Sequence, residues 1–202
     1  QWNEPTILRW ASPMFHFGVL FVFLGHLLGL VIPKTWTEAA GVSQHTYHLV
    51  ATIPGTIAGL VTIIGLVLLI YRRVVVKSVR VATTRMDVVT YVMLSIPVGL
   101  GAVATIVNQV LGGHEGYDYR ETISVWFRSI FYLHPQAHLM ADVPLTFKLH
   151  IVAGLLLFCV WPFTRLVHVV SAPVGYVARP PVIYRSRDSR REHELTRGGM
   201  SD

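Results

Sequence analysis

The stretch from residue 147 to 170 constrains this chain most strongly, because it is apolar over a length that can cross a lipid bilayer. A membrane-spanning helix needs about 20 mainly apolar residues. Three further stretches share this character, at about residues 13–32, 48–71 and 87–111. Composition agrees, since 14% of the 202 residues are charged, against about 25% in a typical soluble domain. The sequence therefore predicts an all-α integral membrane protein with a bundle of four transmembrane helices.

The longest connection, residues 112–146, contains one more helical pattern. Within residues 119–133 the large apolar side chains recur on a single helical face: Ile123, Phe127, Ile130 and Phe131. An amphipathic helix of this kind lies in the membrane interface rather than across the bilayer. We therefore expect an interfacial helix between the third and fourth spans.

Prolines and glycines mark the ends and contacts of the spans. Pro13 follows Ser12, and this pair predicts that the first span begins at Pro13 with Ser12 as its N-cap. In the third span, Pro97, Gly99 and Gly101 predict a kink or a close contact with a neighbouring helix.

The distribution of Lys and Arg predicts the orientation in the membrane. The link 72–86 carries five of these residues and the segment after residue 170 carries six, whereas the other two connections carry one and two. Positive charge accumulates on the cytoplasmic side, so the link and the C-terminus are predicted to be cytoplasmic. We expect a membrane domain over residues 1–184 and a basic cytoplasmic tail over 185–202. The cations follow the apolar segments, which favours membrane orientation over nucleic-acid binding.

Several kinds of site are excluded by residue types. Cys159 is the only cysteine, so the chain has no intrachain disulfide, no iron–sulfur or zinc site built from cysteines, and no CxxCH motif for covalent haem. No Asp or Glu lies in the middle of a span. This argues against a proton-coupled transporter with a buried acid relay and against a metal site of histidines and carboxylates.

The first and fourth spans each carry two histidines. His150 and His168 are eighteen residues apart, which is five turns of a continuous helix, so both are predicted on one side and about 27 Å apart. With the predicted topology, His16 and His168 lie toward the cytoplasm, and His26 and His150 lie further out. One imidazole from each of two helices at each of two depths favours two six-coordinate b-type haems. The alternative is that these are histidines hydrogen-bonded at helix ends near the membrane interface.

Four segments together resemble the gamma subunit of respiratory nitrate reductase. They are PMFHFGVLFVFLGHLLGL (13–30), RRVVVKSVRVATTRMD (72–87), FKLHIVAGLLLFCVWPFTRLVH (147–168) and SAPVGYV (171–177). That subunit is a membrane dihaem cytochrome b, which oxidises quinol and feeds an iron–sulfur beta subunit and a molybdenum catalytic alpha subunit. Members of the family usually have one more span before the first one seen here.

The resemblance implies specific ligands for the two haems. His16 pairs with His168 for the haem nearer the cytoplasm, and His26 pairs with His150 for the distal haem. Arg72, Arg73 and Arg165 are candidate partners of haem propionates or anionic lipid, the alternative being a purely topological role for these cations.

The resemblance also implies a quinol site beside the distal haem, near Gly25 and His26. The family has a lysine near the start of the second span that takes part in quinol binding, and this sequence has none there. We expect His45 or His48 to hydrogen-bond the quinol instead, the alternative being that both are interfacial histidines.

The expected function is therefore that of the membrane cytochrome b subunit of a respiratory nitrate reductase in the bacterial cytoplasmic membrane. Its expected cofactors are two b haems, its substrate is quinol from the membrane pool, and nitrate is not reduced on this chain. A dihaem cytochrome b of another quinol-linked complex, serving a formate, hydrogen or sulfur enzyme, is the alternative of the same class. A non-redox membrane anchor or transporter is the alternative of a different class.

Overall fold

The computed structural model describes residues 5–112 and 116–171. Within these residues the secondary structure is helical throughout, without strands. The α-helices are α1 (Pro5–Leu30), α2 (Lys34–Ala39), α3 (Gln44–Val75), α4 (Lys77–Val81), α5 (Arg85–Thr105), α6 (Ile123–Phe131), α7 (Leu145–Val160) and α8 (His168–Ser171). The predicted basic tail and residues 172–177 of the last family motif lie outside the described residues.

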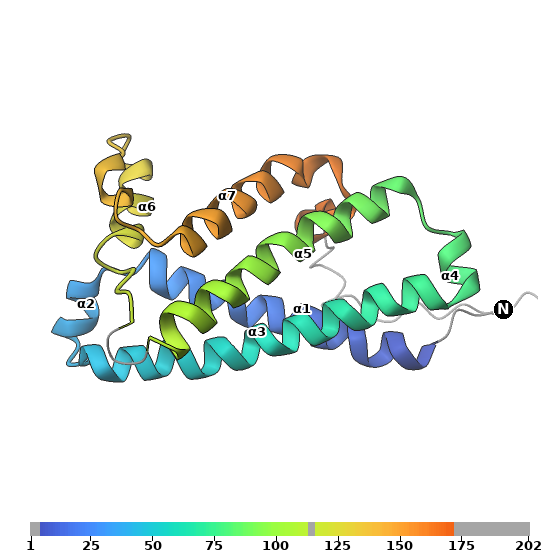
Figure 1. The fold of residues 1–202 in the computed structure, drawn as a ribbon, viewed down its shortest axis with the longest axis horizontal. Coiled ribbons are helices and arrows are strands. Elements are labelled where there is room, and N and C mark those ends of the chain that lie inside the picture. Colours follow the sequence, from blue (N-terminus) through green and yellow to red (C-terminus); the bar gives the residue numbers. More distant parts are fainter. Residues whose placement is uncertain (1–4, 113–115, 172–202) are drawn as a thin grey trace, which may run out of the picture. The chain divides into compact units, whose positions relative to one another are not determined.

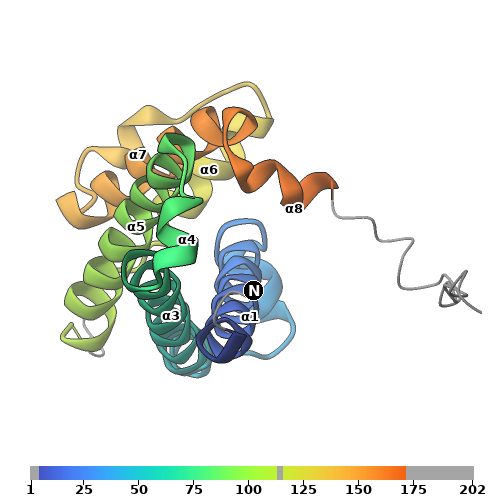
Figure 2. The ribbon, with the colours of Figure 1, turned by 90° about the vertical axis from the view of Figure 1, so that its right-hand side faces the viewer.

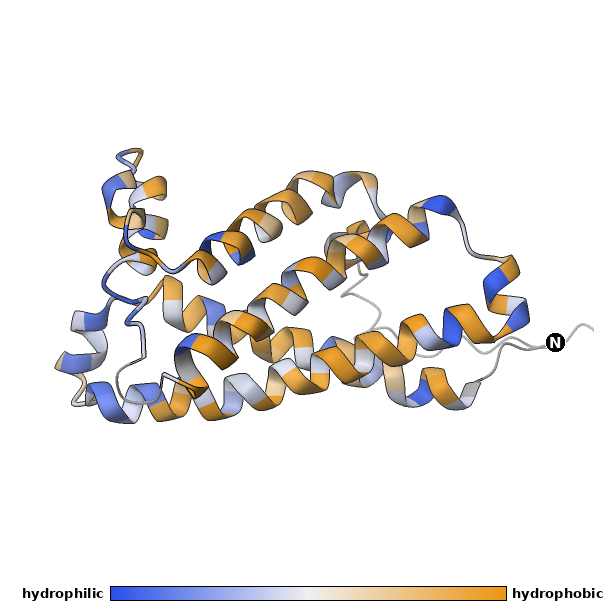
Figure 3. Ribbon diagram, viewed as in Figure 1, coloured by the Kyte–Doolittle hydropathy of each residue, from blue (hydrophilic) through white to orange (hydrophobic). Residues whose placement is uncertain are grey.

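Four of these helices are long and apolar enough to cross a membrane, and each overlaps one of the four predicted spans. The qualifying segments are Thr6–Leu30, Gln44–Val75, Arg85–Asn108 and Leu145–Phe163. Figure 3 shows their apolar character, with hydrophilic residues gathered at the helix ends and in α2 and α4. The prediction of an all-α membrane protein with four spans is confirmed.

The spans form two closely packed pairs, which are joined by a contact between α3 and α5. Helix α1 runs along α3, and α5 runs along α7 (Figures 1 and 2). The first pair is close because glycines remove side chains from the contact. A Cβ atom on Gly18 would lie 2.5 Å from Thr62 Oγ1, and one on Gly65 would lie 2.5 Å from the Phe15 backbone nitrogen. Small residues at such contacts let membrane helices approach backbone to backbone.

The start of the first span differs from the prediction. Helix α1 begins at Pro5, and Pro13 lies inside it. The preference for proline in the first turn of a helix therefore applies to Pro5 rather than to Pro13. A proline inside a membrane helix removes only one backbone donor, and the apolar residues before Pro13 allow the helix to continue through it.

The fourth span is shorter than the predicted continuous helix over residues 147–170. Helix α7 ends at Val160 and is followed by two 3₁₀ turns, Trp161–Phe163 and Arg165–Val167. Pro162 explains the break, because it lacks the backbone donor that would continue the α-helical ladder. The prediction that His150 and His168 share one side of a single helix is therefore wrong.

The remaining boundaries shift without changing the topology. Helix α3 is four residues longer at each end than predicted. The third span runs through α5 into a π-helical turn, Ile106–Val110. The predicted interfacial helix is present as α6, and it is tied to the end of α1 by hydrogen bonds from Ser124 Oγ to Gly29 O (2.6 Å) and from Arg128 to Leu30 O (2.9 Å).

Candidate haem and quinol sites

Two of the four predicted ligands, His26 and His150, lie next to each other although 124 positions separate them in the sequence. His26 is on α1 and His150 is on α7, and their ring centres are 5.9 Å apart with a 40° angle between the ring planes. Two imidazoles from different helices therefore lie close together.

The proton of each ring has a defined place. His26 Nδ1 lies 2.8 Å from Val22 O, and His150 Nδ1 lies 3.0 Å from Pro97 O. A carbonyl oxygen only accepts hydrogen bonds, so Nδ1 carries the proton in both rings and Nε2 keeps its lone pair. Metal-binding histidines usually have this arrangement, in which the second nitrogen donates to a fixed acceptor.

The spacing of the two rings fits axial ligation of a haem iron. Two metal–nitrogen bonds of about 2 Å each, extended from each nitrogen to the centre of its ring, place the ring centres about 6 Å apart. Around this pair, a Cβ atom on Gly25 or on Gly154 would meet no atom within 4 Å. One of these glycines is beside His26 and the other is a turn beyond His150, and neither adds a side chain there. No group of three or more metal-binding side chains occurs in the described part of the chain.

The other predicted pair, His16 and His168, is divided between two structural units. His16 repeats the local pattern of His26, since its Nδ1 donates to the carbonyl of Ser12 at 2.7 Å, one turn earlier in α1. His168 is the first residue of α8, which belongs to the second unit. The pairing of His16 with His168 stays a prediction.

A cavity of about 350 Å³ lies between the start of α3 and the loop before α6. The residues that line it are Gln44, His45, Tyr47, His48, Ala51, Gly116, Tyr117, Asp118, Tyr119 and Arg120. It therefore gathers His45 and His48 at one site, whereas Gly25 is not part of its lining. Tyr119, which lines this cavity, packs against α1 at Gly29, three residues after His26, since a Cβ atom on Gly29 would lie 2.9 Å from its hydroxyl. Burial raises the pKa of Tyr119, so its hydroxyl stays protonated.

Arg120 is the residue of this cavity that sequence analysis missed, because it counted there only as a topological charge. The side chain is 2% exposed, its guanidinium lies 3.6 Å from the centre of the Tyr47 ring, and it donates to Thr37 Oγ1 at 2.8 Å. Its Nε and one terminal nitrogen have no hydrogen-bond partner among the described residues. Burying an arginine whose donors lack partners costs free energy, and a ligand oxygen that accepts from these donors would offset the cost. Its place directly after two tyrosines in the longest connection, YDYR, was the available signal.

Known proteins resemble the chain over nearly its whole length. The sequence profile of the family described as "Nitrate reductase gamma subunit" matches residues 1–187. The nitrate reductase gamma chain of Bacillus subtilis is 43% identical over 184 residues, which cover 91% of this chain and 81% of that protein. The chain belongs to the nitrate reductase gamma subunit family.

Two other relatives of this gamma-family chain differ in how much of their own length it matches. The respiratory nitrate reductase 1 gamma chain of Escherichia coli is 34% identical over 179 residues, covering 88% of this chain and 77% of that protein. The nitrate reductase-like protein NarX of Mycobacterium tuberculosis is 54% identical over 190 residues, covering 93% of this chain and 29% of NarX. The chain thus spans less than a third of NarX and most of the two gamma chains.

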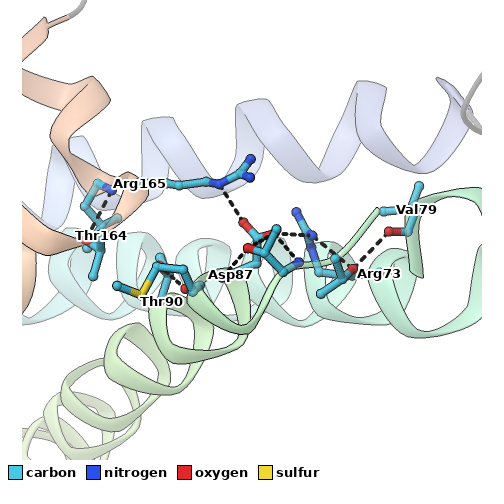
Figure 4. Close-up of polar contacts among 10 residues, drawn as sticks. Arg73, Val79, Asp87, Thr90, Thr164 and Arg165 are labelled. Carbon is cyan, nitrogen blue, oxygen red and sulfur yellow. Dashed lines mark hydrogen bonds and ion pairs between the residues drawn. The ribbon is translucent and has the colours of Figure 1, made fainter. Parts of the chain in front are cut away.

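At the opposite end of the spans, this gamma-family chain has a polar cluster around the buried carboxylate of Asp87 (Figure 4). Asp87 Oδ2 accepts from the Thr84 backbone nitrogen (2.8 Å) and hydroxyl (2.9 Å), and Arg73 lies 3.3 Å away. Asp87 Oδ1 is 2.9 Å from Arg165 Nε. Two of the three arginines considered as propionate partners from the sequence, Arg73 and Arg165, therefore contact a protein carboxylate.

Proposed function

We propose that this chain is the membrane cytochrome b subunit of a respiratory nitrate reductase, which oxidises quinol and passes electrons to an iron–sulfur subunit. The observation that carries the proposal is the His26–His150 pair, whose rings lie 5.9 Å apart with Nδ1 of each held by a backbone carbonyl. The family match favours nitrate reductase over formate, hydrogen or sulfur enzymes as the partner system.

In this proposal the chain holds two b haems, one between His26 and His150 and one between His16 and His168. A b haem supplies an iron centre that accepts and releases single electrons. The protein fixes the ligand nitrogens of His26 and His150 through their Nδ1 hydrogen bonds, and the helices that carry these two histidines are apolar spans. Each quinol that becomes a quinone releases two protons and two electrons, and the electrons leave toward the cytoplasmic partners, the iron–sulfur beta and molybdenum alpha subunits.

The quinol head group is proposed to bind in the cavity that contains His45 and His48, with Gly25 and His26 nearby in the same region of the bundle. His48 Nε2 has no hydrogen-bond partner among the described residues and is available to a quinol hydroxyl. Arg120, with two unused nitrogen groups, supplies donors to a quinol or quinone oxygen. The positive-inside pattern puts this cavity on the outer side of the bacterial cytoplasmic membrane and the C-terminus inside.

The first experiment is a haem b count per polypeptide, from the reduced-minus-oxidised spectrum of the protein purified from membranes. Two haems that a quinol analogue reduces are expected for the wild type. His26→Ala and His150→Ala should each leave one haem, and His138→Ala, which changes a histidine in a connecting loop, should leave two. A folded wild-type sample without haem would refute the proposal, and loss of both or neither haem in His26→Ala would refute the pairing.

A second experiment separates quinol binding from haem binding. His48→Ala and Arg120→Met are expected to retain two haems and to raise the quinol-analogue concentration needed for half-maximal haem reduction. The same concentration dependence as in the wild type, for both variants, would place the quinol elsewhere.

A further inference from the structure

The ring of His150 is held by a hydrogen bond to a neighbouring helix, unlike the rings of His16 and His26. His16 and His26 donate to carbonyls one turn earlier in their own helix, at Ser12 and Val22. His150 instead donates across the helix pair to Pro97 O on α5, at 3.0 Å. Its orientation therefore depends on how closely α7 approaches α5.

Gly101 makes this approach possible. A Cβ atom at position 101 would lie 2.8 Å from His150 Cε1, 3.1 Å from Nδ1 and 3.5 Å from Nε2. The imidazole thus covers the glycine, with three ring atoms close to the place that a side chain would occupy. No larger residue fits there without displacing the ring.

A second contact holds α7 near α5 one turn before His150. Asn108, in the π-helical turn that follows α5, donates to the hydroxyl of Thr146 at 2.8 Å. Thr146 is four residues before His150, so this bond fixes the turn from which the ring projects. The ring is therefore held directly by its hydrogen bond to Pro97 O, and the helical turn that carries it is held by the bond between Asn108 and Thr146.

We propose that Gly101 is a positioning residue for His150, and that the absence of a side chain at position 101 sets the orientation of this ligand. The inference rests on the proposed function, because it assigns the oriented ring to the distal haem. Through Gly101 the ring reaches Pro97 O, which keeps the proton on Nδ1 and leaves Nε2 as the ligating nitrogen. The haem held by His16 and His168 does not depend on this contact.

The distances from position 101 to the His150 ring show what a side chain there would do. Ordinary van der Waals contact begins at 3.4 Å, whereas an alanine Cβ would start 2.8 Å from Cε1. The ring must therefore turn or retreat, and either movement lengthens the bond to Pro97 O. Loss of such a hydrogen bond to a metal-binding histidine typically weakens metal binding about 10- to 100-fold.

The test compares Gly101→Ala with Gly99→Ala in the full chain purified from membranes. Both variants add one methyl group to α5, but a Cβ atom at Gly99 meets nothing within 4 Å. The readouts are haem b per chain, the low-spin haem signals in electron paramagnetic resonance, and a redox titration of each haem. The distal signals are identified as those that His26→Ala removes.

We expect Gly101→Ala to lower the haem content from two toward one, or to shift the distal signal and potential, while the other haem stays as in the wild type. Gly99→Ala should match the wild type. If Gly101→Ala does not accumulate, Thr146→Val carries the test, because it removes only the hydroxyl that Asn108 contacts and should shift the distal signal with two haems retained.

Several results would overturn the inference and leave the proposed function standing. In each of them the wild type binds two haems. The first is an unchanged distal signal in Gly101→Ala, and the second is an equal change of that signal in Gly99→Ala. Where Thr146→Val replaces Gly101→Ala as the test, the third is an unchanged distal signal in Thr146→Val. A folded wild type without haem would refute the proposed function itself.

Discussion

Replacing Asp87 with alanine is expected to destabilise the chain through two separable losses. The first is the N-terminal cap of α5, where the Asp87 carboxylate accepts from Thr84 and Thr84 in turn accepts from the Asp87 backbone; such a cap contributes about 1 kcal/mol. The second is the contact with two arginines. Removing one partner of a fully buried ion pair costs about 3–5 kcal/mol, whereas an exposed pair contributes about 0.2–1 kcal/mol.

Exposure decides where Asp87 falls between these limits. The side chain of Asp87 is 4% exposed, that of Arg73 is 24% exposed and that of Arg165 is 65% exposed. We therefore expect about 1–2 kcal/mol from Arg73 and less than about 0.5 kcal/mol from Arg165, because water screens the second pair. With the cap included, Asp87→Ala should lower the free energy of unfolding by about 2–4 kcal/mol.

The assay is equilibrium unfolding in mixed detergent micelles, followed by circular dichroism. Thr84→Ala isolates the side-chain part of the cap and should cost about 1 kcal/mol, and Arg165→Ala isolates the exposed ion pair. The reasoning is refuted if Asp87→Ala lies within about 0.5 kcal/mol of the wild type, which is the range of an ordinary surface substitution. It is equally refuted if Arg165→Ala costs as much as Asp87→Ala.

Two further predictions concern other parts of the fold. Gly65→Ala brings a Cβ atom against the Phe15 backbone and should destabilise the α1–α3 pair by about 1–3 kcal/mol. Gly59→Ala, on the same helix but with open space around it, should leave the stability unchanged. Equal stabilities of the two variants in the same unfolding assay would contradict the close contact at Gly65. Hydrogen bonds to Glu121 and Asp118 raise the pKa of Lys34 above its ordinary value of 10.5, so the stabilisation is complete below about pH 10.5 and is lost as the pH rises through the folded-state value. Thermal stability measured between pH 8 and pH 12 should therefore fall at the alkaline end, and Lys34→Met should fall less; an equal fall in both would remove Lys34 as the cause.

The sequence predicts the features that depend on local composition. Four apolar stretches gave four spans, and the apolar face of Ile123, Phe127 and Ile130 gave α6, because hydropathy and helical period are properties of neighbouring residues. The close contact expected around Gly99 and Gly101 is present at Gly101 alone. Which of the two glycines meets a neighbour depends on the rotation of α5 against α7, and one sequence does not contain that information.

Other features were missed because they are tertiary. Pro13 and Pro162 have the same local chemistry, yet α1 continues through the first and α7 ends just before the second. The burial of Arg120 follows from the packing of Tyr47 against its guanidinium, 73 positions away in the sequence. The burial of Arg120 thus depends on what lies across the bundle rather than on the adjacent residues.

The division of the spans into the pairs α1–α3 and α5–α7 has a consequence for biogenesis. Each pair is closed by its own glycine contacts, at Gly18 and Gly65 in one and at Gly101 in the other, so each can form as soon as its two helices have entered the membrane. His26 and His150 belong to different pairs. A ligand that binds both histidines can therefore bind only after the two helix pairs have associated, and its binding stabilises that association.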